Sequence, residues 1–327
     1  NSTNYFYQVF ANNQGGAGPI SNRDNITTGT LPNITFSSTT TSVTESGRRG
    51  DADWFIQEGT TTDEKVGGQF FAHNAIDSEM NIIGFGATYG DYVGSNQGYS
   101  DWIVAKFDPS GERLWKKQIG TENYDWGLGG GVVVDSNDYI YLYGYRSPAS
   151  GQSYNTQRRL MKLDKDGNIQ WDKYVDSSPS TNSAESSDMI IEGNYLYLTG
   201  KNPDKNPDIY KYDLNGNQIA SKIITTSFTS THYLPSGLAA NSSAVYFTVY
   251  GNDGSNVVSD LIKFPLDLSS QTLLNTTTDM QFNEMGLLSN GNVVVMARDM
   301  TSDPVSAPIM RIFNSSGTQL SSGTKNQ

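Results

Sequence analysis

Five aromatic residues in polar stretches of the chain are the side chains best suited to bind a ligand. Asn, Asp, Ser or Gly flanks every one of them, and they are Tyr92, Tyr99, Tyr124, Trp126 and Tyr154. A flat ring stacks on the apolar face of a sugar, while neighbouring amides and carboxylates bind its hydroxyl groups. The pattern therefore favours a surface that binds a glycan or a protein. Most of the 19 tyrosines of the chain must nevertheless serve packing.

The sequence favours no catalytic centre. The chain has no cysteine and two histidines, of which His73 lies in a strand-like run and His232 in a Ser/Thr-rich connection. A Gly-x-Ser-x-Gly elbow that would hold a serine nucleophile is missing. Acidic pairs such as Asp135 and Asp138 suit a glycosidase in residue type, but their spacing does not place them across a sugar. We therefore expect a non-enzymatic protein. The alternative is a polysaccharide-processing enzyme with carboxylates and a histidine around one channel.

Three short motifs have a structural explanation beside the functional one. Residues 164–168, Asp-Lys-Asp-Gly-Asn, resemble the start of a calcium loop but lack its distal glutamate, so we expect a hairpin turn. Residues 127–131 are rich in glycine, but no Lys-Ser/Thr pair or helix follows as in a phosphate-binding loop. Arg49-Gly50-Asp51 matches a tripeptide that integrins recognise, which is too short to be specific. We expect no cofactor and no metal, with calcium as the alternative.

Charge and composition exclude several classes of partner. The chain carries 22 Lys and Arg against 34 Asp and Glu, a net charge of −12, so its average surface repels the phosphates of nucleic acids. Apolar runs fall short of the roughly 18 residues that cross a bilayer, so we expect no membrane insertion. The absence of cysteine excludes disulfides and thiolate zinc sites, and it favours a prokaryotic or viral source.

A repeat of about fifty residues must position these groups. Its clearest marker is an apolar segment with a central Lys or Arg, found at 104–108, 160–164, 209–213, 261–264 and 309–313. A turn with Asp or Asn first and Gly fourth follows at 108–111, 164–167, 213–216 and 314–317. Further repeat positions are Trp54, Trp115 and Trp171 at the start of one strand, and Gly84, Gly144 and Gly200 in another.

Each repeat contains four apolar runs separated by turn residues, with no competing helical periodicity. Four antiparallel strands form a twisted sheet with two faces to cover, and radial packing against neighbouring sheets covers both. The sequence therefore predicts an all-β protein, a β-propeller of four-stranded blades over residues 54–327. Five repeats are visible, so we expect an incomplete propeller within a larger multidomain chain.

The order of these motifs closely resembles the repeats of seven-bladed β-propellers in large bacterial surface and secreted proteins. The resemblance covers roughly residues 54 to 323 and is strongest at 101–145. It weakens in the last two copies, where the tryptophan and part of the turn are lost. Such repeats are structural signatures, so the resemblance implies a fold but does not identify a function.

The N-terminal residues have a different character. Residues 1–30 resemble the last two strands of a fibronectin type III domain, an immunoglobulin-like β-sandwich, with Tyr5 at the position of the family's corner tyrosine. Because two strands do not form a sandwich alone, we expect the remaining strands upstream. Residues 31–53 form a Ser/Thr-rich linker.

These observations favour a non-enzymatic structural or binding module outside the cell or on its surface. The propeller would be a rigid head for adhesion to a protein or glycan, with type III domains as spacers. A subunit of a virus tail fibre or an extracellular filament is the second possibility. The connections at 89–100 and 146–157 are longer than their counterparts in later copies. They occupy the same place in adjacent repeats, so we expect them to project side by side as one elaborated rim.

Overall fold

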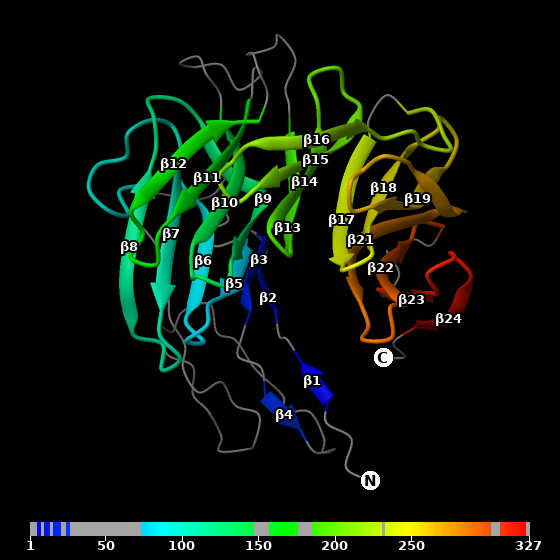
Figure 1. Cartoon of the computed structure of the whole chain (residues 1–327), viewed down its shortest axis with the longest axis horizontal. Helices are drawn as coiled ribbons and strands as arrows, with labels where there is room; N and C mark the ends of the chain where they lie inside the picture. Colours follow the sequence, from blue (N-terminus) through cyan, green and yellow to red (C-terminus); the bar gives the residue numbers. More distant parts are fainter. Residues whose placement is uncertain are drawn as a thin grey trace.

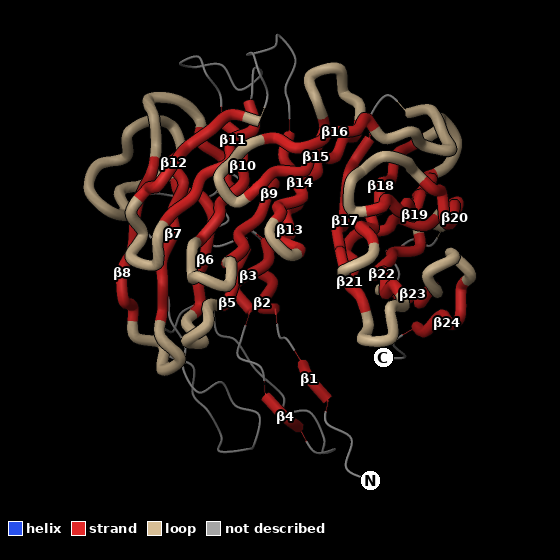
Figure 2. The backbone as a smooth tube through the Cα atoms, viewed as in Figure 1, coloured by secondary structure: helices blue, strands red, loops and turns tan. Residues whose placement is uncertain are grey.

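The computed structural model describes residues 73–146, 157–175, 185–230, 233–301 and 308–324, together with the backbone of four short strands nearer the N-terminus. Every regular element in this part of the chain is a β-strand (Figures 1 and 2). The described residues contain no helix long and apolar enough to cross a membrane. The all-β class predicted from the repeat is confirmed.

Five antiparallel four-stranded sheets follow one another along the chain, each with its strands in sequence order. Blade 1 contains β5 (His73–Ile76), β6 (Ile82–Thr88), β7 (Asp101–Phe107) and β8 (Arg113–Ile119), and blade 2 contains β9 (Asp125–Val134), β10 (Ile140–Arg146), β11 (Gln157–Leu163) and β12 (Ile169–Tyr174). Blade 3 contains β13 (Glu185–Glu192), β14 (Tyr195–Lys201), β15 (Pro207–Asp213) and β16 (Gln218–Ile223). Blade 4 contains β17 (Tyr233–Asn241), β18 (Ala244–Asn252), β19 (Val257–Pro265) and β20 (Thr272–Thr278), and blade 5 contains β21 (Met280–Leu287), β22 (Val293–Asp299), β23 (Ile309–Phe313) and β24 (Gln319–Thr324).

The blades pack radially around their first strands, as in a β-propeller. Each of β5, β9, β13 and β17 contacts the first strand of the next blade. Each apolar cluster joins two neighbouring blades: Trp102 and Val104 pack with Leu142, and Tyr197 packs with Phe247. Within the described residues no comparable contact joins β5 to β21, so the five blades form an open arc (Figure 1). A count of seven blades stays a prediction.

The N-terminal strands form two short antiparallel pairs. β1 (Tyr5–Tyr7) pairs with β4 (Asp24–Ile26), and β2 (Phe10–Asn13) pairs with β3 (Gly16–Ile20). The type III sandwich, the linker at 31–53 and Trp54 all involve residues outside the described part, so the predictions about them are untested.

The turn between the third and fourth strands has the predicted geometry. In blade 2 the Gly167 amide donates to the Asp164 carbonyl at 3.0 Å, and Gly167 has a φ of +79°. The Asp164 carboxylate accepts the amides of Asp166 and Asn168, and its second oxygen accepts the Asn168 side-chain amide at 3.0 Å. Both oxygens thus hold the turn closed, which favours the hairpin interpretation of this motif over the calcium one.

The repeated lysine links each blade to the next, which explains its place in the motif. In four blades the third-strand ammonium group donates to a backbone carbonyl in the following blade's turn. We call this contact the inter-blade lysine bond. It joins Lys106 to Lys165 (3.4 Å), Lys162 to Leu214 (3.3 Å), Lys211 to Leu266 (2.9 Å) and Lys263 to Ser315 (3.5 Å).

Strand pairing corrects two assignments in the repeat. Gly144 and Gly200 pair with Arg159 and Asp208, and their counterpart in blade 1 is Gly86 rather than Gly84. In blade 5 the turn begins at Asn314, so Ile312 rather than Arg311 occupies the lysine position. Where a strand carries apolar residues on both faces, the sequence does not determine which residues pair across neighbouring strands. The register is therefore defined only by the strand pairing in the structure.

Trp115 and Trp171 lie on the fourth strands, β8 and β12. Each indole is partly buried at the outer edge of its sheet and packs against the apolar cluster between two blades. Each ring packs on the turn glycine of the next blade, Trp115 on Gly167 and Trp171 on Gly216. The indole NH of Trp115 also donates to the Lys165 carbonyl at 3.0 Å.

Candidate functional site

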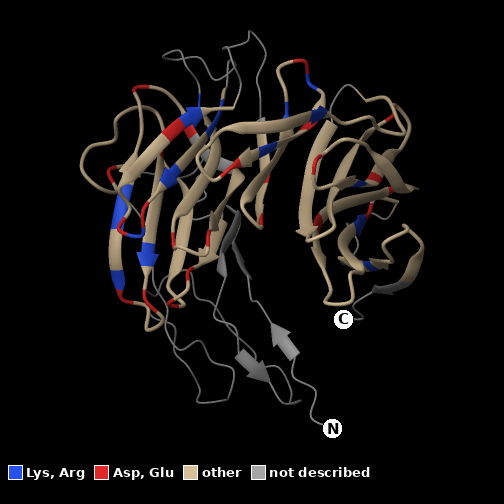
Figure 3. Ribbon diagram, viewed as in Figure 1, with Lys and Arg blue, Asp and Glu red and all other residues tan. Residues whose placement is uncertain are grey.

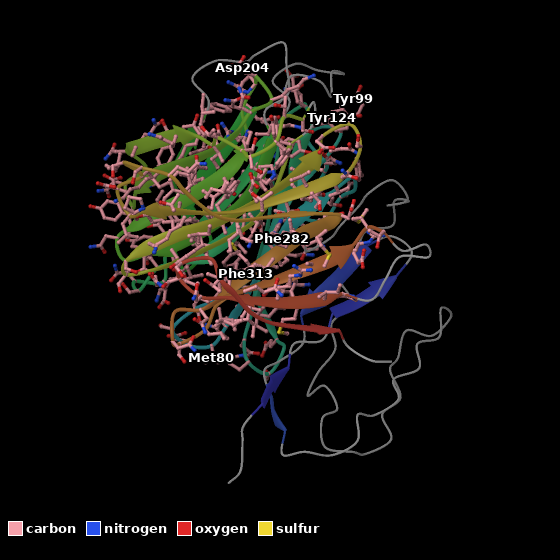
Figure 4. All side chains as sticks on the ribbon, turned by 90° about the vertical axis from the view of Figure 1, so that its right-hand side faces the viewer. Met80, Tyr99, Tyr124, Asp204, Phe282 and Phe313 are labelled. Carbon is pink, nitrogen blue, oxygen red and sulfur yellow. The ribbon has the colours of Figure 1, made fainter. Side chains whose placement is uncertain are left out.

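Two of the predicted ligand-binding residues form a stacked pair at one edge of the blade arc. The rings of Tyr99 and Tyr124 are 4.7 Å apart between centroids and nearly parallel, at 12°. Tyr99 comes from the β6–β7 connection and Tyr124 from the β8–β9 connection. Figure 4 shows both at the upper edge of the propeller, at the opposite end from Met80. Half of the surface of Tyr99 is exposed, so this residue is accessible to a ligand. We call these two residues the tyrosine pair.

Backbone contacts hold the tyrosine pair in place. The Tyr99 amide donates to the Asn123 carbonyl at 3.2 Å. A Cβ atom on Gly98 would lie 2.1 Å from the Thr121 carbonyl oxygen, so only glycine permits this close approach. Asp125, which is fully buried, accepts the amide and the hydroxyl group of Thr121 at 2.7 and 2.8 Å. The two loops are thereby joined into one rigid support for the rings.

An open groove of about 440 Å³ extends from this support along the outer edge of blade 1 to blade 2. Gln97, two residues before Tyr99, lines its beginning, and Lys117 is the only charged residue among the described residues of its lining. The lining residues are Gln97, Lys117, Gln118, Ile119, Gly120, Gly167, Asn168 and Ile169. We call this feature the rim groove.

Gln118 fixes the long β6–β7 connection against β8 behind the rim groove. Its side-chain oxygen accepts the amides of Tyr92 and Val93 at 2.8 and 2.7 Å, and its side-chain nitrogen donates to Asp101 at 2.7 Å. Asp101 has no exposed surface, and burial raises the pKa of its carboxyl group. A Cβ atom on Gly120 would lie 1.8 Å from an Asp101 oxygen, so glycine is required there.

The other predicted ligand-binding residues are not part of this surface as described. We expected Tyr92 to project from the rim, but it is 5% exposed, and the Lys116 ammonium nitrogen lies 4.4 Å from its ring centroid. The polar neighbours of Tyr92 mark a loop that folds back over the sheet, which the sequence does not distinguish from a projecting one. Trp126 pairs with Tyr145 through its backbone, and its side chain is outside the description. Tyr154 and the 147–156 loop are also outside it, so the two-loop rim stays a prediction.

The structure also places titratable side chains at one level of the inner strands, which the sequence analysis missed. His73 on β5, Asp188 on β13 and Glu284 on β21 occupy equivalent positions in their sheets. Gly131 and Gly237 occupy the same position on β9 and β17. An alignment of the first strands would have shown this level, because each of the five residues lies four positions before the first turn of its blade.

Asp188 has the most perturbed environment of this group. Burial between the inner strands and the nearby charge of Glu284 raise the pKa of Asp188 to about 8. Burial also raises the pKa of Glu284. One Asp188 oxygen accepts the Met189 amide at 2.7 Å. Asp188 therefore holds a proton near neutral pH, which is the state that a general acid requires.

Comparisons with known proteins found structural neighbours but no relative in sequence. No family model matches the chain, and no curated protein matches it in sequence. Among solved structures, the Hadza microbial sialidase Hz136 superposes with a TM-score of 0.51 at 12% identity, over 80% of this chain and 59% of that one. A protein from Lactobacillus plantarum gives 0.49 at 13% identity, over 79% and 72%. A putative TolB from Agrobacterium tumefaciens gives 0.43 at 11% identity, over 79% and 82%. At these identities the similarity concerns the fold alone.

Proposed function

We propose that this chain is a non-enzymatic extracellular binding module that contacts a glycan through the tyrosine pair and the rim groove. The observation that carries this proposal is the half-exposed ring of Tyr99, held rigidly by the backbone beside an open groove. A sugar ring would stack on Tyr99, and the side-chain amide of Gln97 would bind its hydroxyl groups. Rigid placement keeps the entropic cost of binding low.

The lining of the rim groove supports binding rather than hydrolysis at this place. Among the described residues, neither a carboxylate nor an imidazole lines it. Glycoside hydrolysis commonly needs two carboxyl groups on either side of the bond to be cleaved. A cell-surface protein and a virus tail fibre would use the same contact surface, so the proposed location is outside the cell or on a virion.

The proposal is tested by glycan-array binding with Tyr99→Ala. We expect binding to fall at least tenfold, about 1.4 kcal/mol, because the sugar loses its stacking surface. Tyr195→Ala is the matched control, since Tyr195 is 38% exposed on β14 and lies under the Lys211 ammonium group at 3.7 Å. Equal binding by Tyr99→Ala and the wild type would move the ligand site away from the rim.

The inner strands favour polysaccharide processing as a second candidate function. His73, Asp188 and Glu284 share one level there, and Asp188 holds its proton near neutral pH. Release of reducing ends from a panel of polysaccharides would measure this activity. Asp188→Asn should abolish it while leaving binding at the rim unchanged. Release that is undiminished in Asp188→Asn, or absent from the wild type, would reject this second function.

A further inference from the structure

The rim groove differs in charge from the rest of the molecule. The chain has a net charge of −12, yet in the part of the chain that the structure describes Lys117 is the only charged residue that lines the groove. Lys117 belongs to β8, which also carries Arg113 and Lys116, and Figure 3 shows this basic strand at the outer edge of blade 1. β8 therefore brings positive charge to the groove, whose blade 2 end is formed by a turn that also carries Asp164 and Asp166.

Lys117 is the cation of β8 that the groove presents. Adjacent residues of a strand point to opposite faces, and Lys116 lies over the buried ring of Tyr92. Lys117 points the other way, and its Cε atom would lie 3.0 Å from a Cβ atom on Gly167. Its ammonium group thus lies beside the turn of blade 2, at the end of the groove away from Gln97.

Two carboxylates close to the groove, Asp164 and Asp101, leave Lys117 available for a further partner. Asp164 is close enough for Lys117 to help to lower its pKa, but the turn amides already bind its oxygens. Asp101 is fully buried behind Gly120. Within the described residues no carboxylate lies at ion-pair distance from the Lys117 ammonium nitrogen. An ammonium group has three donors, so Lys117 can bind an anionic group of a ligand.

We propose that the rim groove selects a carboxylated polysaccharide of the uronic-acid type, an inference that rests on the proposed glycan-binding function. One sugar would stack on Tyr99, and a carboxylate further along the chain would pair with Lys117. The volume of about 440 Å³ falls within the range of small-molecule sites, roughly 300 to 1,000 Å³. The groove is open at its surface, so a polymer can continue beyond it.

The test compares two forms of one polymer. Sodium polygalacturonate carries a carboxylate on each sugar, and its fully methyl-esterified form has the same backbone without the charge. Binding of both to the wild type would be measured by calorimetry at 50 and 300 mM NaCl. We expect the acidic form to bind at least tenfold more tightly at low salt, with a difference that shrinks at high salt because exposed charges are screened.

Variants of Lys117 test whether this residue causes the preference for the charged polymer. Lys117→Gln should lower affinity for polygalacturonate about tenfold and leave the esterified form unchanged, while Lys117→Arg should retain the preference. Lys222→Gln removes an exposed lysine of β16 and is the matched control. Thermal melting would confirm that each variant is folded.

The outcomes distinguish a failure of the uronic-acid inference from a failure of the proposed glycan-binding function. Equal binding of both polymers, or an unchanged affinity in Lys117→Gln, would overturn the inference and leave the glycan-binding function standing. Binding of neutral glycans alone would also overturn it. If the wild type binds no glycan of the array and neither polymer, the inference and the proposed function fail together.

Discussion

Asp188 shows how a position on the inner strands changes an ordinary carboxyl group. The unfolded chain would release its proton near pH 4, whereas the folded chain keeps it up to a pKa of about 8. Between these values the folded state binds more protons than the unfolded state. The free energy of unfolding therefore decreases as pH rises from about 4 to about 8.

Replacing Asp188 should remove this dependence on pH. We expect Asp188→Asn to be more stable than the wild type at pH 8 by about 1 to 3 kcal/mol, with the gap closing near pH 4. Asp188 retains some accessible surface, so this range lies below the full value of the shift. Urea denaturation at pH 4.5, 6 and 8 would measure it, with Asp204→Asn at an exposed turn as the control for charge. A parallel pH profile for Asp188→Asn and the wild type would contradict this assignment.

Tyr92 and Tyr99, both in the β6–β7 connection, should respond differently to truncation. Tyr92→Ala removes a buried ring and should lower the free energy of unfolding by about 3 kcal/mol. Tyr99→Ala removes a half-exposed ring and should change it by less than about 1 kcal/mol. Chemical denaturation measures both, and similar losses would mean that Tyr99 also serves packing. Shortening the whole loop would remove Tyr92 too, so it is a poorer test of ligand binding than Tyr99→Ala.

At the scale of elements, two turn glycines allow the energetic cost of backbone strain to be measured apart from that of steric contact. Gly167 and Gly193 both have positive φ, at +79° and +58°. A side chain costs about 1 to 2 kcal/mol in this conformation. A Cβ atom on Gly193 meets nothing within 4 Å, whereas one on Gly167 meets Trp115 and Lys117 at 3.0 to 3.2 Å. Gly167→Ala should therefore be the more destabilising variant in thermal denaturation, and equal losses would exclude the packing contribution.

The inter-blade lysine bond should contribute to stability at each interface. Lys211 is 7% exposed, and it donates to the Leu266 carbonyl at 2.9 Å. Lys211→Met keeps the aliphatic chain and removes the donor, so we expect a loss of about 1 to 2 kcal/mol in urea denaturation. Lys222→Met on the exposed strand β16 is the control. If both variants lose the same free energy of unfolding, the inter-blade lysine bond does not contribute to stability.

The sequence predicted those elements whose signals are local. The turn at 164–167 followed from Asp and Gly at fixed positions. Tyr99 and Tyr124 were selected as aromatic rings in polar stretches, and their binding of a ligand stays a prediction. The direction of Tyr92 and the register that makes Gly86 equivalent to Gly144 depend on tertiary contacts and strand pairing, which residue types do not encode locally. The inner-strand group was missed because its members differ in type and lie far apart in sequence.

At the scale of the molecule, the arc should tolerate the loss of one complete blade. Deleting residues 185–232 removes blade 3 and brings Lys162 to the turn that Lys211 now contacts, so the inter-blade lysine bond can re-form with the Leu266 carbonyl. Circular dichroism should show an unchanged strand signal, and unfolding should remain cooperative. Deleting 207–230 removes β15 and β16 only, and we expect that protein to aggregate because two strands leave adjacent faces uncovered. Identical behaviour of the two deletions would argue against interchangeable interfaces.

A bond that crosses every blade boundary in the same way also bears on how such a gene can change. Unequal recombination between two repeats adds or removes about fifty codons, wherever in the repeat the exchange occurs. Because each lysine recognises a backbone carbonyl and no particular side chain, a newly adjacent blade offers a matching acceptor at once. The number of repeats can then change without new mutations at the interfaces between blades. Selection is left to act on the loops at the edge, where one lineage can acquire a different ligand from the next.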